Sequence, residues 1–124
     1  MAGERDRRRA WAFGLAAETA AAMFLRLKGY RIIERRHRNP RGEIDLVARR
    51  GKTLVFAEVK ARAEEETAVT AVTPHQRRRI EGAAAGFLAR RNVPPDAAVR
   101  FDLIAVSPWR LPRHIPDAWR PESF

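Results

Sequence analysis

The sequence predicts an α/β domain whose elements follow the order α-β-β-β-α-β. Three observations carry this prediction: an Ala-rich, proline-free segment at 10–28, two apolar strand segments joined by a turn between residues 44 and 60, and a second helix that precedes the apolar segment 99–106. The last segment is apolar enough to lie inside a sheet covered on both faces. With 124 residues, the chain has the length of one domain, which we place at 1–124.

The first half of the chain supplies one helix and three strands. A helix is predicted over 10–28, because Ala-rich sequence favours helix and Gly29 is a suitable C-terminal cap. A short strand at 30–33 is followed by a basic loop at 35–42, which contains Pro40 and Gly42. Strands at 44–48 and 53–60 then form a hairpin, since Gly51 permits the backbone conformation of the turn between them.

The second half begins with an acidic segment at 64–66, which we expect to be mobile. A helix is predicted from residue 73 to about residue 91, because Thr73 and Gln76 have capping-box spacing and Pro74 suits the first helical turn. The strand 99–106 follows. Four prolines in residues 108–124 predict an irregular tail that packs on the domain through its apolar side chains.

The composition indicates an anionic partner. Lys and Arg number 25 against 15 Asp and Glu, so the formal net charge is +10, which favours nucleic acid as the partner. An alternative explanation of the charge is a general excess of Arg and Ala in the proteome of the source. The absence of cysteine excludes disulfides and thiolate zinc sites, and it fits a reducing cytoplasm.

The N-terminus has some resemblance to a secretory signal, but Glu4 and Asp6 lie in its basic part and Glu18 interrupts its apolar part. No apolar run approaches the roughly 20 residues of a membrane-spanning helix. We therefore expect a soluble, cytoplasmic protein. Phosphate-binding glycine loops, a G-x-S-x-G elbow and paired histidine ligands are absent from the sequence.

The hairpin carries charged residues at positions where a core is expected. Side chains alternate between the faces of a strand, so Asp45 and Glu58 converge if their faces coincide, and Lys60 points the same way as Glu58. Two adjacent carboxylates repel unless a cation lies between them, and hard oxygen ligands suit Mg²⁺. The alternative is a cross-strand salt bridge between Lys60 and one of the acids.

Two further polar residues point towards the same region. Glu18 lies on the inward stripe of the first helix with Trp11, Leu15 and Leu25; alternatively, it pairs with an arginine of the basic loop. Gln76 shares a face with apolar residues of the second helix and could reach the site, or it closes the capping box with Thr73.

Several segments together resemble a known family: "GLAAETAAAMFLRLKGYRIIERRHRNPRGEIDLVA", "LVFAEVKAR", "AVTPHQRRRIEGAAAGFL", "RFDLIAV" and "RHIPDAW". They are similar to the YraN-like family of small bacterial proteins, which resembles the archaeal Holliday-junction resolvases and the PD-(D/E)XK, or restriction-endonuclease-like, nucleases. The resemblance covers Phe13 to Trp119 and implies a mixed central β-sheet flanked by α-helices. The sequence departs from the family pattern at Arg36, at Gln76 and in the segment "EEETAVT", which bears on substrate contacts and loop geometry.

The resemblance also implies roles for individual residues. Asp45 and Glu58 are the expected Mg²⁺ or Mn²⁺ ligands, Lys60 the catalytic lysine, and Glu18 the acid that completes the cluster; Glu43 is a possible auxiliary residue, as is Gln76. The implied activity is hydrolysis of DNA phosphodiester bonds, with branched or structured DNA as the candidate substrate. The alternative is a non-catalytic nucleic-acid-binding protein of the same fold. A homodimer is a further expectation. Phosphate contacts are expected from clustered arginines. These arginines are Arg35, Arg36, Arg38, Arg41, Arg77, Arg78 and Arg79.

Overall fold

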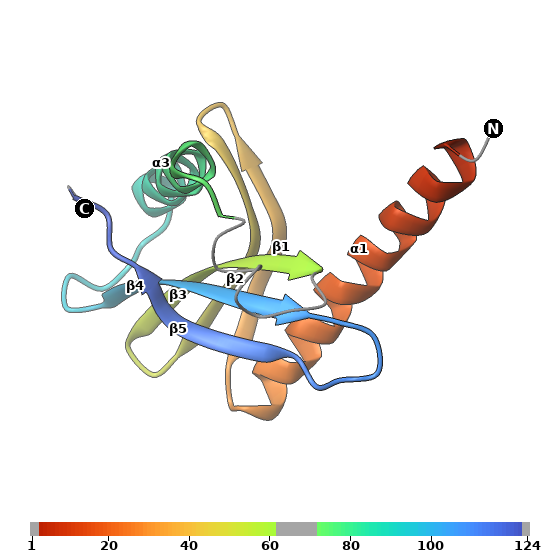
Figure 1. Ribbon diagram of the computed structural model, residues 1–124. Coiled ribbons are helices and arrows are strands. Elements are labelled where there is room, and N and C mark those ends of the chain that lie inside the picture. The colour runs from red at the N-terminus through yellow and green to blue at the C-terminus, as the bar shows by residue number, and fades with distance from the viewer. Residues whose placement is uncertain (1–2, 62–71, 123–124) are drawn as a thin grey trace.

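A five-stranded mixed sheet forms the centre of the protein (Figure 1). The computed structural model describes residues 3–61 and 72–122, with the backbone alone over 6–12; the acidic segment 64–66 lies outside this range. The strands are β1 (Arg31–Asn39), β2 (Gly42–Arg50), β3 (Thr53–Ala61), β4 (Ala98–Val106) and β5 (Arg113–Trp119). They follow this order across the sheet, and every neighbouring pair is antiparallel except the parallel pair β3 and β4.

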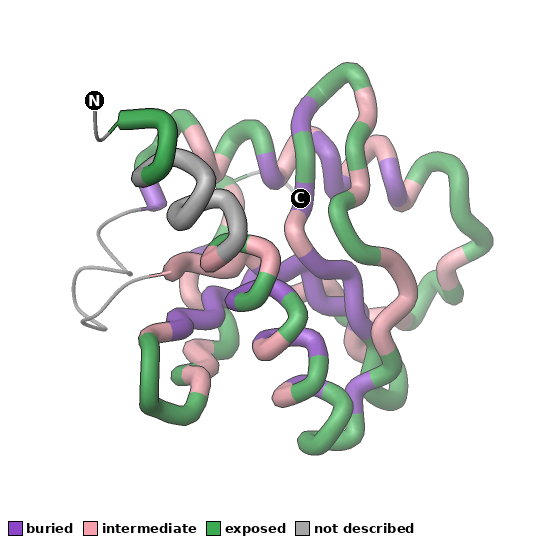
Figure 2. The backbone as a smooth tube through the Cα atoms, turned by 90° about the vertical axis from the view of Figure 1, so that its right-hand side faces the viewer, coloured by how far each residue is buried: buried purple, intermediate pink, exposed green. Residues whose placement is uncertain are grey.

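Two helices cover the opposite faces of the sheet (Figure 1). Helix α1 (Gly3–Leu27) packs its small residues and Leu25 against one face, where Leu46, Val55 and Ile104 are fully buried. Helix α3 (Pro74–Arg90) packs Ile80 and Phe87 on the other face, against Phe56 and Phe101. Successive residues of a strand therefore pack alternately into the two cores, one on each face of the sheet. Figure 2 shows the buried residues concentrated in the strands and in the helix faces that meet them. The predicted α/β class is confirmed, and the architecture is compatible with a restriction-endonuclease-like fold.

The start of α3 follows the predicted capping chemistry. The Thr73 side chain accepts a hydrogen bond from the backbone N–H of Gln76, and the Gln76 side chain accepts one from the backbone N–H of Thr73. The hairpin of β2 and β3 also forms as predicted, with Gly51 at a φ of 60° in its turn. Neither described helix is long and apolar enough to cross a membrane.

Two boundaries in the N-terminal half differ from the prediction. Helix α1 begins at Gly3 rather than at residue 10, and β1 continues to Asn39, so the predicted basic loop is mostly strand. Strand β1 lies at the edge of the sheet, where most of its charged side chains remain in contact with water, and this conceals the continuation of the predicted 30–33 strand as far as Asn39. The β1–β2 turn contains only Pro40 and Arg41, between Asn39 and Gly42.

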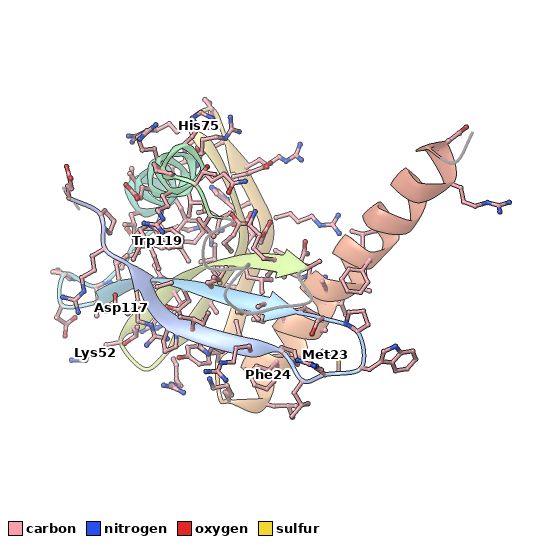
Figure 3. All side chains as sticks on the ribbon, viewed as in Figure 1. Met23, Phe24, Lys52, His75, Asp117 and Trp119 are labelled. Atoms are coloured by element: carbon pink, nitrogen blue, oxygen red, sulfur yellow. The ribbon has the colours of Figure 1, made fainter. Side chains whose placement is uncertain are left out.

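The predicted irregular tail contains a strand. Strand β5 accommodates Pro116 because it is the other edge of the sheet, where an absent backbone N–H removes no interior ladder bond. The register shifts between the pairs Leu103–Ile115 and Phe101–Trp119, and Asp117 in this stretch has a φ of 53°. Trp119 is buried between β4 and α3 (Figure 3), and its indole N–H donates to Glu81 at 3.0 Å.

Candidate active site

Strands β2 and β3 separate at the point where their carboxylates lie. Their ladder ends at the pair Leu46–Ala57, and the next residues along the two strands are Asp45 and Glu58. The Asp45 carboxylate replaces a ladder partner there, since its Oδ2 accepts a hydrogen bond of 2.8 Å from the backbone N–H of Val59. The splayed strands thus bring the two acids together and expose them to one cleft.

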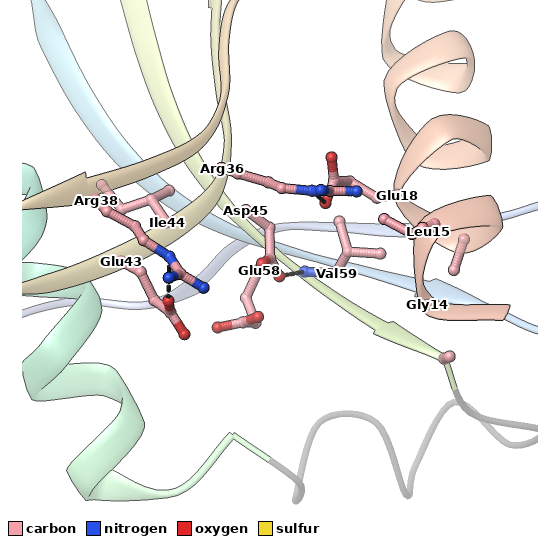
Figure 4. Close-up of a pocket in the computed structure, with 12 residues that line it drawn as sticks. Gly14, Leu15, Glu18, Arg36, Arg38, Glu43, Ile44, Asp45, Glu58 and Val59 are labelled. Atoms are coloured by element: carbon pink, nitrogen blue, oxygen red, sulfur yellow. Dashed lines mark hydrogen bonds and ion pairs between the residues drawn. The ribbon is translucent and has the colours of Figure 1, made fainter. Parts of the chain in front are cut away.

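This cleft, of about 370 Å³, lies between α1 and the sheet (Figure 4). Helix α1 contributes Glu18, β1 contributes Arg36 and Arg38, and β2 and β3 contribute the two carboxylates. A second hollow of about 390 Å³ adjoins it and shares Glu43 and Glu58 with it. The second hollow is completed by Lys60, His75, Gln76, Arg79 and Ile80. Glu58 therefore lies between two spaces, and each of them is lined by both acidic and basic side chains.

The surroundings of Glu58 favour its protonated form in the metal-free protein. Burial raises the pKa of this carboxyl group from 4.5 to about 9, and hydrogen bonding with Asp45 and the charge of Asp45 act in the same direction. The positive charge of Lys60 opposes this rise in pKa, whereas Glu43 adds to it. A divalent cation between the two acids would favour the ionised form of both carboxylates and so oppose the effects of burial and repulsion on Glu58.

Lys60 lies in the second hollow beside Glu58. Within the described residues it forms no ion pair with Asp45 or Glu58, and its effect on Glu58 is that of a nearby charge. The cross-strand salt bridge that the sequence left open as an alternative is therefore not formed. The ammonium group remains available to a ligand in this hollow.

Glu18 faces the cleft, but arginines occupy its carboxylate. The residue is 7% exposed; Arg35 donates its Nε–H to Oε1 at 3.1 Å, and Arg36 donates its Nε–H to Oε2 at 2.9 Å. Across the described ranges 3–61 and 72–122, no group of three or more acids and histidines is placed to hold a metal ion. The structure thus brings Asp45 and Glu58 together and leaves Glu18 in a separate ion-pair cluster.

The two auxiliary candidates have partners as well. Glu43 borders both hollows and forms an ion pair of 3.1 Å with Arg38, both side chains being largely exposed. Gln76 borders the second hollow, while its side-chain oxygen accepts the Thr73 backbone N–H at 3.2 Å. The capping box is therefore formed, and it holds Gln76 near Lys60.

The predicted phosphate-binding arginines lie on several sides of these spaces. Arg36, Arg38 and Arg79 line them directly, and Arg41 lies in the β1–β2 turn. Arg77 faces away, with its guanidinium 5.6 Å from the Trp119 ring. Arg78 is exposed on α3.

Three features of the site were missed by the sequence reasoning. His75 borders the second hollow, and its position between the helix-starting Pro74 and Gln76 was a usable signal. The backbone N–H of Val59 fixes Asp45, which no sequence pattern reveals. Arg36 has a φ of 53°, a left-handed conformation unusual for arginine.

Comparison with known proteins places the chain among close relatives. The family model described as "Uncharacterised protein family UPF0102" matches residues 17–106. This range contains Lys60 and the four candidate acids Glu18, Glu43, Asp45 and Glu58. The chain is 56% identical to a UPF0102 protein of Paramagnetospirillum magneticum over 111 residues, which are 86% of each chain. It is 53% identical to a UPF0102 protein of Parvibaculum lavamentivorans, and the match covers 90% of this chain and 84% of that relative. It is 51% identical to a UPF0102 protein of Rhizobium etli, and the match covers 94% of this chain and 99% of that relative.

Proposed function

The chain belongs to the uncharacterised UPF0102, or YraN-like, family, and from the geometry of its cleft we propose that it is a metal-dependent endonuclease that hydrolyses DNA phosphodiester bonds. We propose branched or structured DNA as its substrate. One observation carries the proposal: Asp45 and Glu58 converge where two strands separate, and Lys60 lies beside Glu58 in the adjoining hollow.

The donors fit a hard divalent cation. Two carboxylates that open to solvent can bind Mg²⁺ or Mn²⁺ and leave the remaining coordination positions to water and substrate phosphate. When bound, such an ion supplies Lewis acidity at the phosphate. Asp45 and Glu58 would hold it, and the Val59 N–H keeps the Asp45 carboxylate oriented towards the cleft.

Lys60 has two tasks in the proposed reaction. Its ammonium group orients the attacking water, and it stabilises the negative charge that develops on the phosphate. The hollow that contains Lys60 also contains Arg79 and His75, which can bind the phosphate on either side of the scissile bond.

A second candidate function is nucleic-acid binding without catalysis. The observation that favours it is the separate Glu18–arginine cluster, which leaves two acids rather than three for a metal ion among the described residues. A fold shared with nucleases does not fix the activity.

A cleavage assay separates the two functions. Linear, flapped and four-way DNA substrates should be incubated with the protein and Mg²⁺ or Mn²⁺. We expect cleavage by the wild type and none by Asp45→Asn, Glu58→Gln or Lys60→Met, whereas DNA binding persists in all three because the phosphate contacts lie mainly on the arginine-rich surfaces. DNA binding by a wild type that cuts no substrate would favour the non-catalytic function.

A further inference from the structure

Glu18 and two arginines form a cluster at the α1 side of the cleft. Arg35 and Arg36 each donate Nε–H to a different oxygen of Glu18, and Arg35 also donates from a terminal nitrogen to the Thr19 hydroxyl at 2.9 Å. Both Glu18 oxygens are therefore engaged by cationic donors. With one carboxylate and two guanidinium groups, the cluster presents a net positive charge to the cleft.

Arg36 is the member that faces the cleft. It lines the cleft and extends from β1 across it to α1 (Figure 4), and its side chain is 52% exposed. Only its Nε–H has a hydrogen-bond partner among the described residues, so its two terminal nitrogens are available to a ligand. A guanidinium held through Nε with its terminal N–H groups exposed can bind two phosphate oxygens at once.

The backbone of Arg36 supports a specific role. Its φ of 53° is a strained conformation for arginine, since only glycine and, less readily, asparagine and aspartate adopt it routinely. Such strain persists where the surrounding structure over-determines it, and it concentrates at functional sites. This backbone conformation occurs at the residue whose side chain crosses the cleft to Glu18.

We propose that this cluster is a phosphate-binding site for the nucleic-acid backbone, in which Glu18 is a positioning residue for Arg36 and not a metal ligand. The inference rests on the proposed function, and it assigns the substrate contacts at the α1 side of the cleft. Arg36 binds a phosphate next to the one at Asp45 and Glu58, and Glu18 holds the guanidinium so that less side-chain freedom is lost on binding.

Binding to a labelled DNA duplex in EDTA tests the phosphate site without any metal ion. We expect Arg36→Asn to lower the affinity and to reduce the slope of log affinity against log salt by about 0.9, the value for one duplex phosphate. Asparagine suits the left-handed backbone, so this variant is expected to fold. Arg31→Asn is the matched control, because it removes the same charge from the exposed start of β1, and it should leave the slope unchanged. Equal slopes for Arg36→Asn and the wild type, or no binding by the wild type, would overturn the inference.

A double-mutant cycle tests the positioning role of Glu18. In a Glu18→Gln background, Arg36→Asn should cost less affinity than in the wild type, because the guanidinium is no longer held in place. An equal cost in both backgrounds would show that Glu18 does not position Arg36.

Mn²⁺ titration without DNA distinguishes this inference from the proposed function. Glu18→Gln should leave Mn²⁺ affinity unchanged, whereas Asp45→Asn should lower it by at least about tenfold. A comparable loss in Glu18→Gln would make Glu18 a metal ligand and overturn the inference. If instead Asp45→Asn has no effect, the proposed metal site fails, while the salt dependence in EDTA still decides the phosphate site.

Discussion

At the scale of single residues, Glu58 makes stability depend on pH. Its pKa in the folded protein is about 9 against an ordinary 4.5, so the folded state holds the proton more tightly than the unfolded state. The stabilising contribution is complete below pH 4.5 and is lost as the pH rises towards 9. In EDTA at pH 8 we expect Glu58→Gln to be more stable than the wild type by roughly 1 kcal/mol or more, since one pKa unit corresponds to about that free energy.

Urea unfolding between pH 5 and pH 9 measures this difference. Added Mg²⁺ should stabilise the wild type and not Glu58→Gln, since only the wild type can exchange the proton for a cation. Parallel stability profiles for the two proteins in EDTA would contradict the assignment of a retained proton to Glu58.

Asp102 produces the opposite dependence. It is fully buried, which by itself raises its pKa, but hydrogen bonds from His114, Arg100 and the backbone N–H of Asp117 outweigh burial and hold the pKa below its usual value. The contribution of Asp102 to stability is therefore present above pH 3.8 and is lost as the pH falls through its lower folded pKa.

Replacing Asp102 isolates this contribution. We expect Asp102→Asn to cost about 3–5 kcal/mol at pH 7, because the Arg100 charge loses its buried partner. Asp117→Asn makes the same chemical change in an exposed pair with Arg120 and should cost far less, because water screens exposed ion pairs. Similar losses in the two variants, measured by urea unfolding, would mean that the buried network is not specially stabilising.

The alternation of side chains between the two faces of β2 and β3 was enough to predict that Asp45 and Glu58 approach each other. The retained proton on Glu58 was beyond prediction, because it depends on burial by residues distant in sequence. For Glu18, the sequence offered an inward acid and an arginine pair as alternatives, and the geometry contains both: the side chain faces the cleft and pairs with two arginines. Only tertiary packing specifies which arginines it meets.

At the scale of the elements, Gly42 determines how closely α3 approaches β2. A Cβ atom at this buried glycine would overlap the backbone carbonyl of Arg79, which cannot move without shifting the helix. We expect Gly42→Ala to destabilise the protein by about 1–3 kcal/mol or more. Gly14→Ala is the control: a Cβ there meets nothing within 4 Å, so better helix propensity should stabilise the protein by about 0.5–1 kcal/mol. Equal effects in thermal unfolding would contradict this account.

The elements that the sequence predicted well are those with strong local signals. The capping box at Thr73, the turn glycine at Gly51 and the apolar strand β4 were all recognisable. The two edge strands were harder to recognise: only the start of β1 was predicted, because the rest of it is rich in charged residues, and β5 was missed because it contains Pro116. An edge strand needs only one hydrogen-bonded neighbour, so its sequence is less constrained than that of an interior strand.

At the scale of the whole molecule, assembly follows from the proposed chemistry. Cutting both strands of a junction symmetrically requires two sites, and a two-fold homodimer is the simplest way to supply them. Trp119 is buried in its own domain and is excluded as a contact, whereas Trp109 is fully exposed at a φ of 65°. The other large exposed apolar side chains of the described residues are Met23, Leu27 and Leu111.

We therefore expect a homodimer that uses the β4–β5 loop, and we expect Trp109→Ser to shift it towards the monomer. Multi-angle light scattering with and without DNA measures the mass, and Leu27→Ser on α1 serves as a second substitution of an exposed apolar side chain outside that loop. A wild type that remains at 14.1 kDa at high concentration under both conditions would contradict the dimer.

The two borders of the sheet limit how such a dimer can be built. At β5, Pro116 lacks an N–H and the N–H of Asp117 points inward to Asp102, so the outer rim has lost donors for an incoming strand. At β1, a second copy that paired its own β1 with this edge would bring Arg31 and Arg35 close to the arginines of the other strand, and the positive charges would repel. Neither edge strand is therefore suited to pair with a strand of another molecule and extend the sheet. Concentrated protein should resist fibril formation, and two copies must meet through helices or loops instead of by adding strand to strand.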